Sequence, residues 1–170
     1  MTNLKVEKEL NKYQIIDVMY ATSFVTESNL IEGITRSPTD LELLEHIKFY
    51  KLTKITIPAL EHFISVYQPG TKLRDKKGLD VKIGKSIPIS GGSDIRRRLI
   101  KLLDDINNRK ISPYEAYISY ELLHPFMDCN GRSGRALWQW LMYRPQMTFL
   151  RQFHHQAIQY HEQYVTPLTL

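Results

Sequence analysis

The stretch "SPYEAYISYELLHPFMDCNGRSGRALWQW", residues 112–140, carries the clearest helix boundaries in the sequence. Ser112 suits the N-cap of a helix, and Pro113 suits its first position. Glu115 stands where a capping box needs an acidic side chain. Together these three residues predict that a helix begins at residue 113.

A second helix should follow after a short loop. Pro125 disfavours helical geometry in the residue before it, so the first helix should end at Leu123 or His124. The second helix should begin near Gly131 and stop at Pro145. Its apolar face comprises Ala136, Leu137, Trp140 and Leu141. The loop between the two helices therefore meets the N-terminus of the second one.

Outward from this pair, apolar periodicity predicts further helices. Residues 3–23 form one predicted helix, residues 39–66 form one or two with a new turn at Pro58, and residues 94–108 form an amphipathic helix. The apolar face of the first should hold Leu4, Leu10, Tyr13, Ile16 and Tyr20. The chain is therefore mostly helical.

Residues 78–92 have a different pattern. The apolar residues Val81, Ile83, Ile87 and Ile89 alternate with polar ones, and Gly84 marks a turn. This alternation predicts a short β-hairpin, which leads into the next helix with Ser93 or Asp94 as its N-cap. The predicted fold class is all-α, with one hairpin as its β element.

Composition indicates one domain, residues 1–170, with a core of its own. Apolar residues make up 42% of the 170 positions and charged residues 24%, as in ordinary globular proteins. The beginning of the sequence has no apolar leader, and no apolar run reaches membrane-spanning length. Cys129 is the single cysteine, so no internal disulfide can form. We therefore expect a cytoplasmic protein with no membrane partner.

The net charge of +5 is unevenly distributed. Residues 72–110 hold twelve Lys/Arg and five Asp/Glu, a surplus of seven positive charges. Such a segment could attract nucleic acid, an acidic protein or a nucleotide, or could form a solvated surface. Charge alone does not choose between these alternatives.

The loop and the start of the second helix suit the binding of phosphate. A helix N-terminus offers unpaired N–H groups and a partial positive charge. Residues 129–132 would supply such donors, and Gly131 allows close approach of an anion. Arg132 and Arg135 lie three residues apart, so they could hold different phosphates.

Two further loop residues suit catalysis on a polyphosphate. Asp128 is the one acid of the loop, and a carboxylate beside phosphates can hold Mg²⁺. His124 is the one loop side chain that titrates near neutrality, so it is the candidate general base for a hydroxyl group. A histidine that merely ends a helix is the alternative when His124 is considered without its neighbours.

The segment "HPFMDCNGRSGR", residues 124–135, resembles the signature of the Fic family, H-P-F-x-(D/E)-G-N-G-R-x-x-R. Cys129 departs from it, since it stands where glycine is usual, and its thiol could narrow the anion site. The resemblance implies an all-α Fic fold with a β-hairpin flap, at residues 78–92 here, that aligns a target protein beside the active site.

The resemblance also implies a role for each residue of the motif. His124 would be the base and Asp128 the Mg²⁺ ligand, while Asn130 would contact the α-phosphate of ATP. Arg132 would hold the phosphate chain and Arg135 the γ-phosphate. The implied nucleotide-binding set of the motif is Asp128, Cys129, Asn130, Gly131, Arg132, Ser133, Gly134 and Arg135.

Nucleotide contacts outside the motif are implied at two places. Ile83, Gly84, Lys85 and Ser86 would cover the nucleotide from the flap, and Lys85 could meet target backbone or phosphate. On the stretch after the motif helix, Phe153, His154 and His161 are candidates to contact adenine. An exposed polar helix is the alternative for that stretch.

Upstream, "TESNLIEGITRS" lies within residues 20–37. By itself it predicts a helix end with Gly33 after the last turn. Beside a Fic motif it resembles the family's inhibitory element, (S/T)-x-x-x-E-(G/N), at Ser28, Glu32 and Gly33. The resemblance implies that Glu32 pairs with Arg135 and restrains the enzyme.

The expected function is transfer of AMP from ATP, with Mg²⁺, to a Tyr, Thr or Ser hydroxyl of a target protein. The alternatives are the same fold with other chemistry (a kinase, phosphocholine transfer or removal of AMP) and a non-enzymatic module that binds nucleic acid through residues 72–110. Nucleic acid is disfavoured because no DNA-binding appendage is evident. The sequence leaves a homo-oligomer open.

Overall fold

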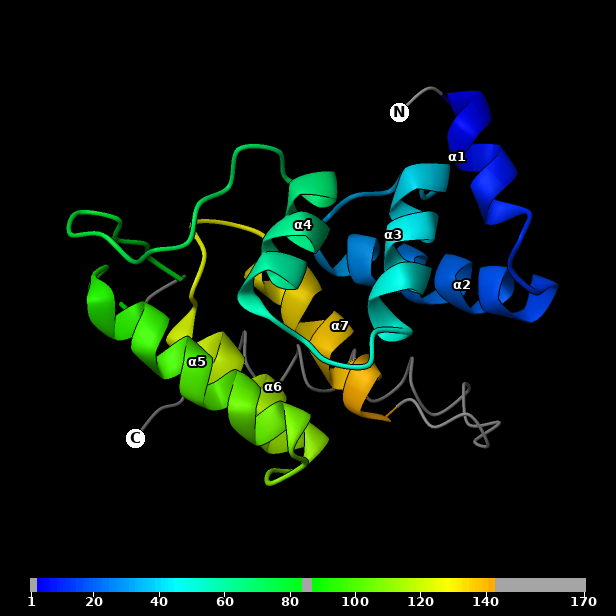
Figure 1. Cartoon of the computed structure of the whole chain (residues 1–170). Coiled ribbons are helices and arrows are strands. Elements are labelled where there is room, and N and C mark those ends of the chain that lie inside the picture. Colours follow the sequence, from blue (N-terminus) through cyan, green and yellow to red (C-terminus); the bar gives the residue numbers. More distant parts are fainter. Residues whose placement is uncertain (1–2, 84–86, 143–170) are drawn as a thin grey trace. The chain divides into compact units, whose positions relative to one another are not determined.

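The computed structural model describes residues 3–83 and 87–142, which form seven helices (Figure 1). These residues group into two compact units. The N-terminal unit runs to Lys51, and the second, here called the motif unit, begins at Leu52. None of the described helices has both the length and the apolar character that crossing a bilayer requires.

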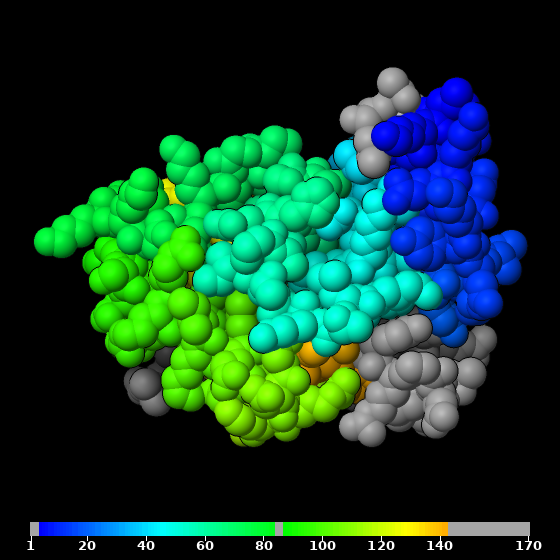
Figure 2. Space-filling view, viewed as in Figure 1, coloured from blue at the N-terminus to red at the C-terminus, as the bar shows by residue number. Residues whose placement is uncertain are grey.

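The N-terminal unit consists of α1 (Asn3–Leu10), α2 (Ile15–Ile31) and α3 (Asp40–Tyr50), and both α1 and α2 pack on α3. Figure 2 shows α1 and α2 in blue beside α3 in cyan. The core of this unit includes Val6, Leu10, Phe24, Val25, Leu44 and Ile47. Helices from three separate stretches of chain thus share one apolar centre.

The prediction of a single helix over residues 3–23 is wrong. Helix α1 ends in a tighter turn, in which the N–H groups of Lys12 and Tyr13 donate to carbonyl oxygens three residues earlier, at 3.2 and 3.0 Å. Gln14 then has an extended backbone, which separates α1 from α2. The buried face also differs from the predicted one, since Leu4 and Ile16 are exposed. The chain therefore forms two helices, α1 and α2, where the sequence pattern predicts one.

The turn between α2 and α3 is fixed at both ends. Gly33 has a positive φ of 75°, and the N–H groups of Gly33 and Ile34 donate to the carbonyls of Leu30 and Asn29, both at 2.9 Å. This pattern is a Schellman motif with glycine in its left-handed position, as the sequence predicts. Helix α3 begins at Asp40, six residues after Ile34.

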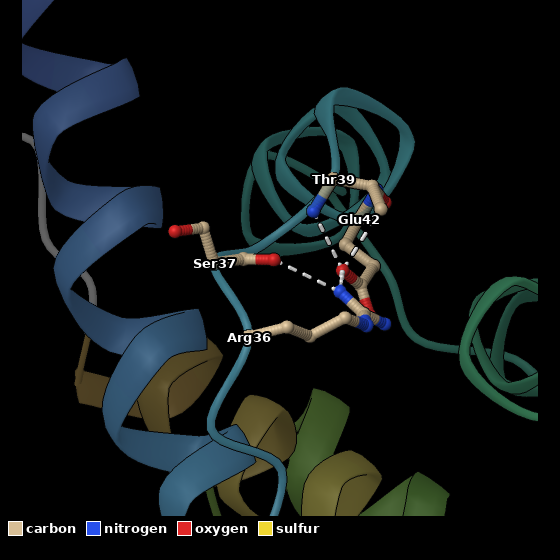
Figure 3. Close-up of polar contacts among 4 residues, drawn as sticks. All are labelled: Arg36, Ser37, Thr39 and Glu42. Carbon is tan, nitrogen blue, oxygen red and sulfur yellow. Dashed lines mark hydrogen bonds and ion pairs between the residues drawn. The ribbon is translucent and has the colours of Figure 1, made fainter.

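The start of α3 is held by a charged cluster (Figure 3). Thr39 and Glu42 form a capping box, and the Arg36 guanidinium donates two hydrogen bonds of 2.8 Å to the Glu42 carboxylate. Burial raises the pKa of Glu42, but the Arg36 side chain and the Thr39 N–H outweigh it and leave the pKa below its usual value. The carboxylate therefore stabilises this turn in its charged form.

The motif unit contains α4 (Ile57–Tyr67), α5 (Ser93–Asn107), α6 (Pro113–Leu123) and α7 (Asn130–Met142). Helix α6 packs on α5 and α7, and α4 packs on α7. The core includes Leu60, Phe63, Ile95, Leu99, Tyr120, Phe126 and Leu137. The two predicted helices of the opening stretch are therefore neighbours in space, as a short loop requires.

Most helix boundaries of the motif unit confirm the sequence patterns. Ser112 caps α6 in a complete capping box with Glu115, and α6 ends at Leu123. Pro58 lies in the first turn of α4. The predicted N-cap of α5 is wrong: the cap is Gly92, which brings no side-chain bond, so Ser93 already lies inside the helix.

Gly134 lies in the interface where α6 packs on α7. A Cβ atom there would lie 2.4 Å from Glu121 Oε1 and 3.1 Å from the Tyr120 ring. The Tyr120 hydroxyl and Ser133 Oγ lie 2.9 Å apart in the same interface. Burial raises the pKa of Tyr120 well above its usual value, so the phenol stays neutral. Ser133 Oγ already donates its hydrogen to the Cys129 carbonyl at 2.8 Å, so the Tyr120 hydroxyl is the donor of this bond.

The predicted hairpin is not seen in the described parts of residues 78–92, here called the flap segment. Those parts contain no strand, only a single bridge position at Ile83, and the expected turn at 84–86 lies outside the described residues. The loop that includes this segment lies at the surface of the motif unit, where its green atoms project in Figure 2. Side chains rather than a strand ladder hold its two ends, as described below.

Candidate functional site

The loop between α6 and α7 is fixed by its own backbone and by one amide. The Asn130 side chain accepts the Phe126 N–H at 2.9 Å and donates to the Phe126 carbonyl at 2.8 Å. Backbone bonds join Lys72 and Arg74 to Met127 and Pro125, around an antiparallel bridge between Leu73 and Phe126. The loop therefore has one defined shape.

His124 occupies the first position of this loop in a left-handed conformation, with φ 48° and ψ 60°. Its N–H donates to the Tyr120 carbonyl at 2.9 Å, which ends α6. The ring Nδ1 lies 3.4 Å from the Glu121 carbonyl oxygen. Because a carbonyl only accepts, a hydrogen bond at this position requires the tautomer with the proton on Nδ1 and the lone pair on Nε2. That is the tautomer a general base needs.

Cys129, at the other end of the loop, also has a positive φ, of 65°. This region costs a side-chain-bearing residue free energy and costs glycine none. The finding gives a physical reason why glycine would be usual at this position. The thiol is buried, so it belongs to the packing of the loop.

The first turn of α7 offers backbone donors. The Ser133 N–H reaches the Cys129 carbonyl at 3.1 Å, but the N–H groups of Asn130, Gly131 and Arg132 precede any intrahelical acceptor. Within the described residues, none of these three N–H groups has a recorded hydrogen bond. They are the positive end of the helix dipole.

Arg132 is the most informative side chain at this helix start. It is 7% exposed, and its guanidinium carbon lies 5.4 Å from the centre of the Tyr67 ring of α4. Among the described residues its Nε has no hydrogen-bond partner, and the side chain forms no ion pair. A buried charge without an opposite charge is costly, so the arrangement suits an anionic ligand.

The other residues of the first two turns divide between two sides of α7. Arg135 is 1% exposed, one turn along from Arg132. Ser133 Oγ donates to the Cys129 carbonyl at 2.8 Å, and Gly134 packs on α6. The nucleotide-binding roles predicted for Ser133 and Gly134 stay predictions, and both residues serve the helix interface.

Asp128 is the exposed acid of the loop, and its Oδ1 accepts the Cys129 N–H at 2.5 Å. Among the described residues, no group of three or more His, Cys, Asp or Glu side chains could hold a metal ion. A single carboxylate fits Mg²⁺ that also binds nucleotide phosphates and water, which is the usual mode for this ion. It does not fit a metal held by protein ligands alone.

The sequence did not single out Arg74 or Tyr67. Arg74 is fully buried, and its guanidinium bonds the carbonyls of His124, Leu79 and Ile89. In the sequence, Arg74 is one of the twelve basic residues of the segment 72–110. A loop has no regular spacing of apolar residues, so its sequence does not distinguish a buried arginine from exposed lysines. Tyr67 is the last residue of a helix with an ordinary apolar pattern, so the sequence does not indicate its contact with Arg132.

Four of the twelve basic residues in the segment 72–110 form ion pairs with acids of the same segment. Ion pairs of 2.7 to 3.0 Å join Arg96 with Asp75, Arg97 with Asp94, Lys101 with Asp105, and Lys110 with Asp104. The basic side chain of each pair is exposed, so the pairs contribute little to stability. They reduce the positive field that a nucleic acid would meet.

In the N-terminal unit, Ser28 is buried, whereas Glu32 is exposed and follows the last residue of α2. Gly33 completes the Schellman motif described above. The predicted inhibitory residues thus occupy a helix end of defined geometry. Their regulatory role stays a prediction.

Several predicted contacts lie outside the described residues. These are Gly84, Lys85 and Ser86 of the flap segment, and Phe153, His154 and His161. Ile83 is described and is exposed.

No family model, curated protein or solved structure matches this chain.

Proposed function

We propose that the protein is an adenylyltransferase that uses ATP and Mg²⁺ to attach AMP to a Tyr, Thr or Ser hydroxyl of a target protein. The observation that carries this proposal is Arg132, a buried guanidinium without a counter-ion among the described residues, at a helix start with three unused N–H groups. This arrangement supports a polyphosphate ligand. The resemblance of residues 124–135 to the Fic signature supplies the reaction class.

In the proposed reaction the target hydroxyl oxygen attacks the α-phosphorus of ATP. The bond from that phosphorus to the bridging oxygen of the β-phosphate breaks, and pyrophosphate leaves. Nε2 of His124 accepts the hydroxyl proton in the tautomer that carries hydrogen on Nδ1, the ring nitrogen 3.4 Å from the Glu121 carbonyl oxygen. The reaction is then chiefly one of positioning and charge stabilisation.

The residues around His124 would orient the phosphates. Arg132 and the N–H groups of the first turn of α7 would hold the phosphate chain, and Arg135 would hold its far end. Mg²⁺ bound at Asp128 would neutralise phosphate charge as the bond to the leaving group breaks. Asn130 supports the site indirectly, since its amide already holds the loop backbone at Phe126.

We further propose that Glu32 restrains the enzyme by pairing with Arg135 and displacing the γ-phosphate. The support is the resemblance of Ser28, Glu32 and Gly33 to the inhibitory element. An arginine that binds either a carboxylate or a phosphate suits such competition. Glu32→Gly should therefore raise the rate of AMP transfer or of self-modification.

One experiment separates the candidate chemistries. The Glu32→Gly protein is incubated with Mg²⁺-ATP and cell lysate, and the mass of each adduct is read by mass spectrometry. We expect an adenylyl adduct that exceeds the wild-type level and disappears in Glu32→Gly/His124→Ala. A phosphoryl adduct would favour a kinase instead.

Two other outcomes would contradict the proposal. The absence of any adduct, with DNA or RNA binding that survives His124→Ala, would favour the nucleic-acid module. Equal and measurable transfer by wild type and Glu32→Gly would dismiss the inhibitory role of Glu32 while leaving the enzyme in place.

A further inference from the structure

Arg74 joins three separate parts of the motif unit through its guanidinium. Its Nη1 donates to the His124 carbonyl at 2.8 Å and its Nε to the Leu79 carbonyl at 2.9 Å, while Nη2 donates to the Ile89 carbonyl. The side chain is fully buried. Three carbonyl groups thus accept hydrogen bonds from one cation. Leu79 and Ile89 lie near the two ends of the flap segment, and His124 is the first residue of the loop between α6 and α7.

The bond to His124 acts on a strained residue. His124 is left-handed, and such a conformation in a residue other than glycine persists only where its surroundings fix it. The Tyr120 carbonyl holds the N–H of His124, and Arg74 holds the carbonyl on the other side. Both peptide groups of His124 are therefore anchored, and this sets the direction in which the imidazole leaves the backbone.

The bonds to Leu79 and Ile89 act on the flap segment. Asp80 Oδ1 accepts the Gly91 N–H at 2.8 Å, and the Gly92 N–H donates to the Arg74 carbonyl at 2.8 Å. A Cβ on Gly91 would lie 2.5 Å from the Leu79 carbonyl oxygen, so glycine is required where the two ends meet. The two ends of the flap segment are therefore held together by hydrogen bonds to Arg74 and between Asp80 and Gly91.

We propose that Arg74 is a positioning residue that couples the flap segment to His124, so that one side chain holds both ends of this segment and the proposed general base. The proposal rests on the proposed function, because it takes His124 as the base. Arg74 itself touches neither substrate nor the transferred group.

Arginine suits this position and lysine does not. The guanidinium presents donors in a rigid planar fork, which can meet three carbonyls at once, whereas an ammonium is a single point on a flexible stem. Burial lowers the pKa of Arg74, and the nearby Asp80 carboxylate opposes that effect. Arg74→Lys therefore keeps the positive charge but loses the planar set of donors that meets the three carbonyl groups.

The test compares Glu32→Gly/Arg74→Lys with Glu32→Gly in the full-length protein. Glu32→Gly/Arg96→Lys is the matched control, since Arg96 pairs with Asp75 at the surface of the same unit. We expect kcat for AMP transfer to fall roughly tenfold to hundredfold while KM for ATP stays within about twofold. The control should retain both constants.

A second readout does not require activity. In ¹⁵N-histidine-labelled protein, the His124 ring nitrogens should report a change of tautomer or exchange broadening in Arg74→Lys only. Amide hydrogen exchange in the described parts of the flap segment should accelerate in the same variant. An unchanged His124 spectrum and unchanged kcat would overturn the proposal.

The two proposals can fail separately. If Glu32→Gly transfers no AMP, the proposed function fails, and the spectrum of His124 and the exchange of the flap segment still decide the coupling. If Arg74→Lys does not fold, Arg74→Gln removes the buried charge and carries the same readouts. In the wild type, the Nε–H of Arg74 should exchange far more slowly than that of exposed Arg98, and equal exchange rates would also overturn the proposal.

Discussion

Three residues other than glycine have a positive φ in the described part of the chain, namely Arg109, His124 and Cys129. Two of them bracket the loop that precedes α7, which places backbone strain at both ends of the candidate site. Strain of this kind is held by the surrounding structure and concentrates where function requires a fixed shape. The proposed base is thus oriented by its backbone before any ligand arrives.

The strain at Cys129 gives a prediction about stability. Cys129→Val should destabilise the protein by about 2 kcal/mol or more, because a branched side chain at φ 65° adds to the cost of a left-handed residue. Cys129→Gly should change stability by less than about 1 kcal/mol, since relief of strain offsets the greater backbone entropy of glycine in the unfolded chain. Urea unfolding measures both.

Ser119→Val is the matched control for this pair. Ser119 is exposed within α6, where the same branched side chain meets ordinary helical backbone. Its change should stay within about 0.5 kcal/mol. Equal losses for Cys129→Val and Ser119→Val would show that the left-handed backbone at Cys129 carries no strain.

For single residues, the sequence indicated which side chains belong to the candidate site better than it indicated the contacts that they make. His124 and Cys129 stood out because the motif fixes residue types and spacing. The engagement of Asn130 with the Phe126 backbone could not be predicted, because an amide beside a loop suits a ligand and a peptide group equally well. Arg74 could not be found either, since its burial depends on contacts far away along the chain.

Among the elements, helix starts with a side-chain cap were the most predictable. Ser112 and Glu115 mark α6 by a local rule that involves four consecutive residues. The break between α1 and α2 contains no proline or glycine. Apolar periodicity alone therefore predicts one continuous helix there. The flap segment shows alternation without a ladder in its described parts, because Arg74 and Asp80 bind the backbone groups that strand pairing would use.

The turn before α3 gives a prediction about pH. The pKa of Glu42 is lower in the folded protein than in the unfolded chain, so the stabilisation is complete above about pH 5 and is lost as pH falls through the folded value. Glu42→Gln should therefore cost about 1–3 kcal/mol at pH 7, and this cost should shrink towards pH 3. Chemical unfolding at several pH values gives the trend.

A double-mutant cycle with Arg36→Gln isolates the ion pair. The coupling free energy between Arg36 and Glu42 should be favourable at pH 7 and approach zero at low pH, since a protonated carboxyl accepts no ionic partner. A coupling that did not change with pH would mean that the capping box, rather than the charge of Glu42, holds this turn.

For the whole molecule, the division at Lys51 and Leu52 separates the proposed inhibitor from the proposed site. Glu32 belongs to the N-terminal unit, while His124, Arg132 and Arg135 belong to the motif unit. The inhibition that we propose is therefore a coupling between two compact units of one chain. Such a coupling is measurable as a difference in ligand affinity between wild type and a variant that lacks the carboxylate.

Tryptophan fluorescence can follow the motif unit by itself. The chain has two tryptophans, Trp138 and Trp140, and both lie on α7. A ligand that binds the folded unit stabilises it by about 2.7 kcal/mol at 100 times its Kd, which raises the melting temperature by roughly 5–10 °C. The shift caused by Mg²⁺-ATP should thus be large in Glu32→Gly and smaller in wild type, where the carboxylate competes.

Glu27→Gln and Glu32→Gln provide a matched pair on the same stretch of α2 and its cap. The same neutral substitution should enlarge the Mg²⁺-ATP shift at position 32 and leave it at the wild-type value at position 27. Arg132→Gln should remove the shift in every background, because it removes the buried cation that the phosphates would meet. If Glu32→Gly showed no shift at all, the phosphate site would lose its support, whereas equal shifts in wild type and Glu32→Gly would leave the site and remove only the competition by Glu32.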